Sequence, residues 1–328
     1  MIEINKEYTI TQWEQIFDPF TQLKKEISRI IVGNEEAIEL MLIAILCNGH
    51  VLLEGVPGIA KTTMIKCIAD AIGLPFKRIQ FTPDLLPADL VGTLIFNPKT
   101  HDFETKKGPI FANIVLADEI NRAPAKVQSA LLESMQERQV TIGSETHKLD
   151  EPFLVFATQN PLEQQGTYQL PEAQIDRFMF KIHIDYPSME NEKEIINKVF
   201  NKQTITKVVK KEDIFNAQKL ISQIYVDQKV IDYITHLVFA TRKPALFNLD
   251  NLTNYIQHGA SPRATLNLYR AAQAHAFVNK RQYVTPDDVK RVALPILRHR
   301  LILSFQAHGE EKTSDVIIHQ ILNNLATP

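Results

Sequence analysis

The chain has 328 residues, of which 45% are hydrophobic and 23% charged, and its formal net charge at pH 7 is −2. This length allows two domains, and the composition excludes a disordered or fibrous protein. The charge argues against a protein that coats nucleic acid, and the two cysteines cannot form a disulfide framework or a four-ligand zinc site. No apolar run reaches the ~20 residues of a membrane span and the first residues lack a secretory h-region, so we expect a cytoplasmic protein.

Short apolar runs alternate with helical patterns through the first half of the chain. The runs over residues 113–117 and 153–158 are continuous rather than alternating, as in strands buried on both faces. Helices are expected over residues 61–71 and after Pro124. Buried strands joined by helices predict an α/β fold with a parallel sheet covered on both faces, a three-layer core. The expected strands cover residues 50–54, 76–80, 113–117, 153–158 and 178–184.

Two insertions in this core have the pattern of β-hairpins. Residues 94–105 place two β-rich arms around an Asn-Pro-Lys-Thr turn, and residues 139–149 place two arms around Gly-Ser.

From Pro187 onward the pattern is helical, with capping hydroxyls followed by proline at Ser261-Pro262 and Thr285-Pro286. Of the 11 glycines, only Gly259 and Gly309 follow Gly166, which suits a helical array. Lys and Arg number 17 against 25 Asp and Glu in residues 1–187, and 19 against 13 in residues 188–328. The charge split fits two independently solvated surfaces or an acidic body that meets a basic cap. We predict an α/β domain over 1–187, preceded by an N-terminal helix, and an all-helical domain over 188–328.

A glycine-containing loop joins the first of these strands to its helix and ends in Lys61-Thr62. Such a turn directs backbone N–H groups into one hollow that suits a triphosphate, with Lys61 on the β- and γ-phosphates and the Thr62 hydroxyl on Mg²⁺. Ala60 stands where the usual pattern has glycine, and because alanine favours negative φ we expect ordinary helical entry there. The loop residues are Gly55, Val56, Pro57, Gly58, Ile59, Ala60, Lys61 and Thr62.

Asp118 and Glu119 follow a buried strand, at the sheet edge where α/β proteins bind ligands. We expect Asp118 to hold the Mg²⁺ shell and Glu119 to orient or deprotonate the attacking water. The competing interpretation is an acidic helix cap. The phosphate-type loop upstream favours the catalytic pair.

Three further polar residues lie next to predicted strands or at the start of a helix. The amide of Asn160 could reach both the γ-phosphate and the water, although an Asn-Pro turn alone would explain it. Arg177 precedes a strand and could act locally or on a neighbouring subunit. Arg263 lies at a helix N-terminus, where a cation is unfavourable without an anion nearby, so a phosphate partner is favoured over a solvated side chain.

Together these motifs resemble an AAA+ ATPase of the MoxR type over nearly the whole chain. The resemblance rests on EGVPGIAKT, LADEINRAP, ATQNP, LPEAQIDRF and SPRA, which begin at residues 54, 116, 157, 170 and 261. It implies that Asn160 is sensor 1, that Arg177 is an arginine finger acting in trans, and that Arg263 is sensor 2. It also implies that Val32 lies against the adenine and that Thr63 belongs to the nucleotide loop. The role of Arg122 stays open.

The resemblance implies a Mg²⁺-dependent ATPase, a hexameric ring with a helical lid, and chaperone-like remodelling of client proteins, including partners with von Willebrand factor A domains. One alternative is a nucleic-acid motor of the helix-2-insert group, for which Lys99, Lys106 and Lys107 are the only hint. Net charge and sparse aromatic residues in the hairpins argue against it. Another alternative, a small-molecule phosphotransferase, lacks an obvious acceptor pocket.

Overall fold

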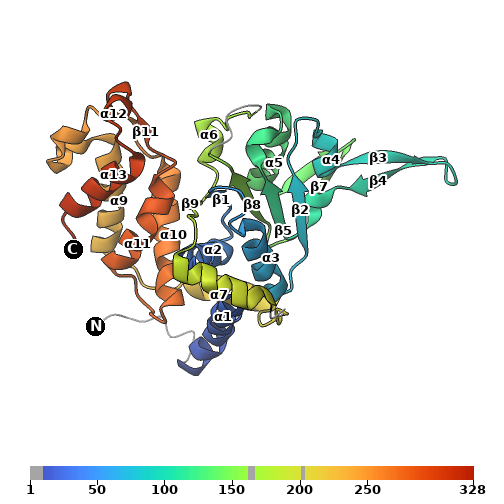
Figure 1. Cartoon of the computed structure of the whole chain (residues 1–328), viewed down its shortest axis with the longest axis horizontal. Helices are drawn as coiled ribbons and strands as arrows, with labels where there is room; N and C mark the ends of the chain where they lie inside the picture. The colour runs from blue at the N-terminus through green and yellow to red at the C-terminus, as the bar shows by residue number, and fades with distance from the viewer. Residues whose placement is uncertain (1–9, 162–166, 201–203) are drawn as a thin grey trace. The chain divides into compact units, whose positions relative to one another are not determined.

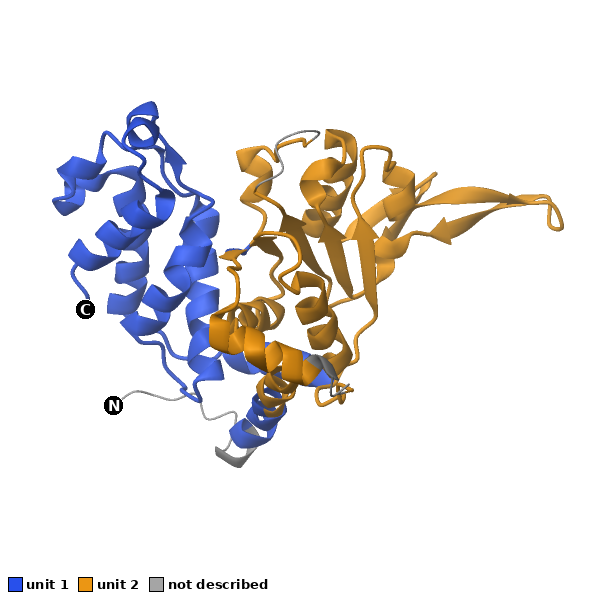
Figure 2. Ribbon diagram, viewed as in Figure 1, with its two compact units in different colours: residues 1–21, 179–181, 212–328 blue, residues 22–178, 182–211 orange. Residues whose placement is uncertain are grey.

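The structure, a computed structural model, describes residues 10–161, 167–200 and 204–328, which form two compact units (Figures 1 and 2). Within the described residues, unit 2 comprises residues 22–178 and 182–211, and unit 1 comprises residues 10–21, 179–181 and 212–328. The division of the chain into functional domains at residue 187 remains a prediction.

A five-stranded sheet in the order β2-β5-β8-β1-β9 forms the centre of the α/β part. The pairs β1–β8, β2–β5 and β5–β8 are parallel, which confirms the predicted parallel sheet. All five predicted strands are present, with bounds that differ by up to two residues at each end. They are β1 (Val51–Glu54), β2 (Phe76–Gln80), β5 (Ile114–Asp118), β8 (Leu154–Gln159) and β9 (Phe180–His183).

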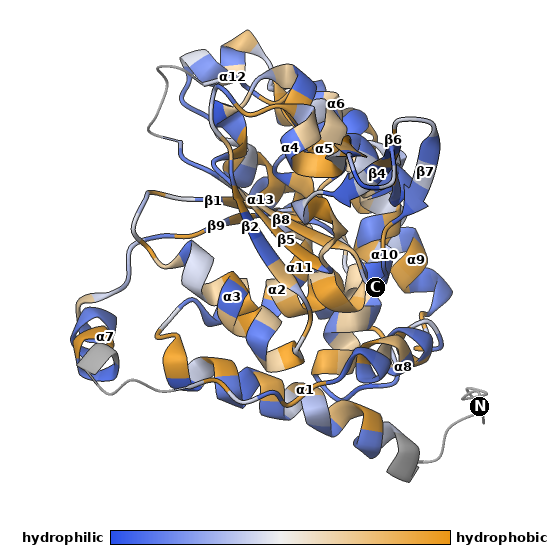
Figure 3. Cartoon of the chain, turned by 90° about the vertical axis from the view of Figure 1, so that its right-hand side faces the viewer, coloured by the Kyte–Doolittle hydropathy of each residue, from blue (hydrophilic) through white to orange (hydrophobic). Residues whose placement is uncertain are grey.

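Helices and apolar side chains cover the sheet. On one face, alternate residues of the strands pack with α4 (Pro87–Val91), the 3-10 turn η1 (Pro109–Phe111) and α5 (Ala125–Glu137) in one buried cluster. On the other face α3 (Lys61–Ile72) contacts β2 and β5. The inner strands are coloured as hydrophobic in Figure 3, whereas the edge strand β2 carries hydrophilic residues. The strands β1 and β8 are buried except at their last residues, Glu54 and Gln159, which are half-buried.

The strand register brings the carboxyl ends of four strands to one edge of the sheet. Glu54 at the end of β1 is aligned with Gln159 at the end of β8. Gln80 at the end of β2 is aligned with Asp118 at the end of β5. Because β1 lies beside β8 and β9 while the next strand along the chain, β2, forms the edge, the strand order reverses beside β1. Ligands of open α/β sheets bind at such a point.

Both predicted hairpins are present. The first pairs β3 (Gly92–Asn97) with β4 (Asp102–Lys107), and the second pairs β6 (Gln139–Ile142) with β7 (Glu145–Lys148). Gly143 turns the second hairpin with φ of 62°, and a Cβ there would meet the Leu94 side chain at 2.6 Å. The root of the first hairpin therefore packs against the turn of the second.

Unit 1 is mainly helical, as predicted for the C-terminal part. The expectation of an all-helical region is wrong in one detail, because β10 (Ile256–His258) and β11 (Ile302–Leu303) form a small antiparallel sheet. The first half of α1 (Ile10–Ile30) also belongs to this unit, and Phe17 and Phe20 pack edge-on against Phe277. The other helices are α8 (Lys211–Ile221), α9 (Gln228–Arg242), η3 (Pro244–Phe247), η4 (Asp250–Leu252), α10 (Pro262–Val278), α11 (Pro286–Leu297), α12 (Phe305–Gly309) and α13 (Ser314–Asn324).

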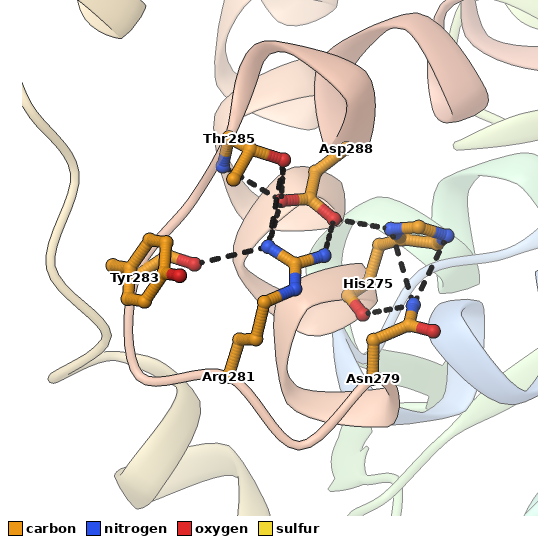
Figure 4. Close-up of polar contacts among 6 residues, drawn as sticks. All are labelled: His275, Asn279, Arg281, Tyr283, Thr285 and Asp288. Atoms are coloured by element: carbon orange, nitrogen blue, oxygen red, sulfur yellow. Dashed lines mark hydrogen bonds and ion pairs between the residues drawn. The ribbon is translucent and has the colours of Figure 1, made fainter.

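A buried carboxylate fixes the corner between α10 and α11 (Figure 4). Asp288 is fully buried and accepts hydrogen bonds from both terminal nitrogens of Arg281, from the backbone and hydroxyl of Thr285, and from His275 Nδ1. Burial alone would raise the pKa of Asp288, but these hydrogen bonds outweigh it and hold the pKa well below its ordinary value. The corner is a stabilising network within unit 1.

Candidate functional site

The loop that connects β1 to α3 has the backbone of an anion-binding turn. Gly58 has φ of 85°, and Ala60, the N-cap of α3, has φ of 62° and ψ of 20°. The expectation of ordinary helical backbone at Ala60 is therefore wrong. The chain enters α3 through a left-handed residue, so the course of the loop overrides the preference of alanine for negative φ.

Lys61, the first residue of α3, points back over this loop. Its Nζ donates a hydrogen bond to the carbonyl oxygen of Gly55. Burial lowers the pKa of the Lys61 ammonium, and the negative charges of Asp118, Glu119 and Glu54 oppose that shift. Lys61 is therefore a half-buried cation near three carboxylates. Phosphate oxygens could replace the Gly55 carbonyl as its hydrogen-bond partner.

Asp118 and Glu119 lie at the end of β5, as predicted, and each is held by other side chains. Thr158 Oγ1 donates to Asp118 Oδ1 at 2.6 Å, and Arg78 donates to Asp118 Oδ2. Glu119 has φ of 56° and its N–H donates to Thr158 Oγ1 at 2.8 Å. The Thr158 hydroxyl therefore links the two acidic residues. Left-handed backbone in a residue other than glycine is costly and is found where the surrounding structure requires it.

The Glu119 carboxylate also has two side-chain donors. Gln80 Nε2 lies 2.8 Å and Arg122 Nε 3.1 Å from Glu119 Oε2. Sequence reasoning left Arg122 without a role, and the structure places it on this carboxylate.

A polar cleft of about 370 Å³ brings most of the predicted residues together. Asn160, only 6% exposed, lies directly after β8 in this cleft. The cleft is lined by Pro57, Gly58, Ala60, Lys61, Thr62, Thr63, Arg78, Asp118, Glu119, Thr158, Gln159 and Asn160.

An apolar cavity of about 760 Å³ is lined by residues of the same loop. Val32 and Ile59 line it and are nearly buried, and Tyr186 and Ile196 contribute further apolar surface. Pro57, Gly58, Ala60 and Thr63 line both this cavity and the polar cleft. The loop therefore borders both a cavity that suits an apolar ring and a cleft that suits charged groups. Among the predicted loop residues, Gly55 and Val56 line neither.

The residues fit a nucleoside triphosphate with a hard divalent cation. The hydroxyl of Thr62 and the carboxylate of Asp118 line the same cleft and are oxygen donors of the kind that Mg²⁺ prefers. The N-terminus of α3 and Lys61 supply the positive potential that phosphate oxygens require.

Comparison with known proteins agrees with this geometry. Residues 50–180 match the model of the ATPase family associated with various cellular activities (AAA), and residues 251–321 match the AAA lid domain. Chaperone MoxR1 of Mycobacterium tuberculosis is 47% identical over 92% of this chain and 81% of its own length. The uncharacterized protein YeaC of Bacillus subtilis is 44% identical over 93% of each chain. The chain belongs to the MoxR family of AAA ATPases. This confirms the resemblance that the sequence motifs indicated.

A solved structure supports the fold of this MoxR-family chain over nearly its whole length. A protein from Cytophaga hutchinsonii that is named as a candidate ATPase superposes with a TM-score of 0.91 at 49% identity, covering 96% of this chain and 97% of that one. In the part of this chain that the structure describes, no helix combines the length and the apolar character needed to cross a membrane.

Two arginines of the predicted set lie outside the cleft. Arg177 follows α6 (Glu172–Ile175), donates to Gln136 Oε1 at 3.1 Å, and lines a separate hollow beside α5. Arg263 lies in the first turn of α10 in unit 1, where its N–H donates to Ser261 Oγ at 3.2 Å. The roles of both arginines in this MoxR-family chain stay predictions.

Sequence reasoning missed three residues that contact the acidic pair. The sequence predicts that Thr158 lies in the strand over residues 153–158 and that Arg78 and Gln80 lie in the strand over residues 76–80. It predicts no contact between these residues and Asp118 or Glu119. Residues two apart on a strand point to the same side of a sheet. The pattern Arg-x-Gln at the end of the strand was therefore the available signal that Arg78 and Gln80 project together from β2.

Proposed function

We propose that this MoxR-family protein hydrolyses ATP with Mg²⁺ and uses the energy to remodel or mature partner proteins. The observation that carries the proposal is the loop Pro57–Ala60, which borders both an apolar cavity and a charged cleft. The cavity would take the adenine beside Val32, and the cleft would take the triphosphate.

Five residues of the cleft have a part in this proposal. Lys61 binds the β- and γ-phosphates together with the N–H groups at the start of α3, and Thr62 and Asp118 hold the metal. Bound Mg²⁺ would neutralise charge on the transferred phosphoryl group. Glu119 orients the attacking water, and Asn160 donates its amide hydrogens to the γ-phosphate and accepts from that water.

The proposal extends to an assembly and to clients. We propose a hexameric ring in the cytoplasm in which Arg177 completes the site of a neighbouring subunit and Arg263 acts as sensor 2. Support comes from the family and from a relative named as a chaperone. Clients with von Willebrand factor A domains belong to this proposal. We do not propose a nucleic-acid motor, because the chain carries no basic excess.

The experiment compares phosphate release and client capture by the wild-type protein and Glu119→Gln. The variant keeps the phosphate-binding groups but loses the carboxylate that orients water, so we expect ATP binding without hydrolysis and longer retention of protein partners. Lys61→Ala is the matched control, because it should lose binding itself. Hydrolysis by Glu119→Gln at the wild-type rate would contradict the catalytic assignment. Failure of Glu119→Gln to enrich any protein beyond Lys61→Ala would contradict remodelling.

A further inference from the structure

A second cation, Arg78, lines the phosphate cleft together with Lys61. It lies in the middle of β2, the edge strand that pairs with β5 (Figure 1). Arg78 is aligned with Leu116, and Gln80 is aligned with Asp118. The Arg78 side chain therefore extends along the sheet by two residues to reach the carboxylate at the end of β5.

The contact engages one oxygen of Asp118 with two donors. Arg78 Nε lies 2.9 Å and Nη2 lies 2.6 Å from Asp118 Oδ2. Arg78 Nη2 also donates to Gln80 Oε1 at 3.0 Å, which fixes the guanidinium on the strand. Thr158 occupies the other oxygen, Oδ1. Both oxygens of a carboxylate that is only 8% exposed are thus bound by donors of the chain itself.

This arrangement affects any cation that approaches Asp118. The Arg78 guanidinium repels a divalent ion that approaches the Asp118 carboxylate. Its hydrogen bonds also occupy Oδ2, one of the two oxygens that could bind the ion. A triphosphate in the cleft would supply the negative charge that offsets this repulsion. Metal and nucleotide would then bind well only together.

We propose that Arg78 is a positioning residue that holds Asp118 and weakens divalent-cation binding until a nucleotide is present. The inference rests on the proposed function in one respect, namely that the cation binds together with a nucleotide. The effect on the bare cation can be measured without nucleotide, and it therefore does not depend on ATP binding.

The test is a titration of the full chain with Mn²⁺, with the free ion followed by electron paramagnetic resonance, without nucleotide and then with ADP. Arg78→Met should bind Mn²⁺ roughly three- to tenfold more tightly than the wild type without nucleotide, because the competing charge is gone. With ADP present the difference should shrink. Lys77→Met is the matched control. It removes one positive charge from an exposed residue that directly precedes Arg78 on the same strand.

Equal or weaker Mn²⁺ binding by Arg78→Met, or an equal gain in Lys77→Met, would overturn the proposal. A purely structural role would lower the melting temperature of Arg78→Met without changing its affinity for Mn²⁺. Should Arg78→Met fail to fold, Arg78→Gln removes the same charge with a polar side chain and is expected to show the same gain. If the wild type binds no ATP in a separate titration while Arg78→Met still gains affinity for Mn²⁺, the proposed function fails and the effect of Arg78 on the bare cation stands.

Discussion

Ala60 shows how a loop can override the preference of a single residue. The sequence predicts negative φ for alanine, but the structure gives φ of 62°. Local propensity could not reveal this, because the requirement comes from the geometry between the end of β1 and the start of α3. The same loop directs Lys61 and the N–H groups of α3 toward the acidic pair.

Ala60→Gly should raise the free energy of unfolding by about 0.5 kcal/mol. The left-handed conformation costs alanine about 1–2 kcal/mol, and the extra freedom of glycine in the unfolded chain offsets part of the gain. Urea unfolding measures the difference. Ala69→Gly, in the interior of α3, is the control and should lower stability by about 1 kcal/mol or more. A less stable Ala60→Gly protein would show that the left-handed backbone at residue 60 carries no strain.

Site residues were predictable where the neighbouring sequence indicates them, and not where they meet only through strand pairing. Lys61, Asp118 and Asn160 each follow a recognisable strand, and the cleft contains all three. Arg78 and Thr158 could not be assigned to Asp118 from the sequence, because each lies 40 residues from it and makes contact only through strand pairing. Predicting such contacts requires the strand order, which the sequence did not supply.

At the scale of elements, long and continuously apolar strands were predictable and very short ones were not. All five strands of the central sheet were predicted, and the apolar runs over residues 50–54, 113–117 and 153–158 indicate β1, β5 and β8 most clearly. The strands β10 and β11 have three and two residues and show no alternation that a sequence pattern could reveal. Their pairing depends on the neighbouring helices of unit 1.

The corner between α10 and α11 carries a prediction about stability. Asp288→Asn should lower the free energy of unfolding by about 2–4 kcal/mol, because Arg281 would lose its buried counter-charge. Asp287→Asn, at the exposed adjacent position, is the control and should change it by less than about 0.5 kcal/mol. Thermal or urea unfolding at pH 7 measures both.

The same pair of variants tests the pH dependence of the network. The pKa of Asp288 lies below its unfolded value, so its contribution is complete above about pH 4 and decreases as the pH falls below that. The difference in unfolding free energy between wild type and Asp288→Asn should therefore shrink in acid. A difference that stays constant down to pH 2.5 would contradict the network described here.

At the scale of the whole molecule, the separation of Arg177 from the cleft raises the question of what completes the site. Arg177 lines a hollow with Gln136 and Gln174 rather than the cleft that holds Lys61. An arginine finger typically contributes about 10³–10⁵ in rate. We therefore expect Arg177→Ala to lose about 10³-fold or more in ATP turnover while it retains nucleotide binding.

Mixed assemblies test whether Arg177 acts in trans. Arg177→Ala and Glu119→Gln subunits should each be nearly inactive alone. Random mixing in equal amounts creates interfaces with an intact Glu119 and an intact Arg177, and should restore about one quarter of the wild-type activity. Phosphate release measures the mixture. A mixture no more active than its separate components would place Arg177 outside any shared site.

Every role proposed for the residues of the cleft depends on a triphosphate bound by the loop before α3. Calorimetric titration with ATP and Mg²⁺ tests this most directly, using wild-type protein and Lys61→Ala, with Lys66→Ala, at an exposed position on the same helix, as the control. We predict saturable binding with one ATP per chain for wild type and Lys66→Ala, and its loss in Lys61→Ala. No heat of binding in the wild type, or unchanged affinity in Lys61→Ala, would contradict the central claim.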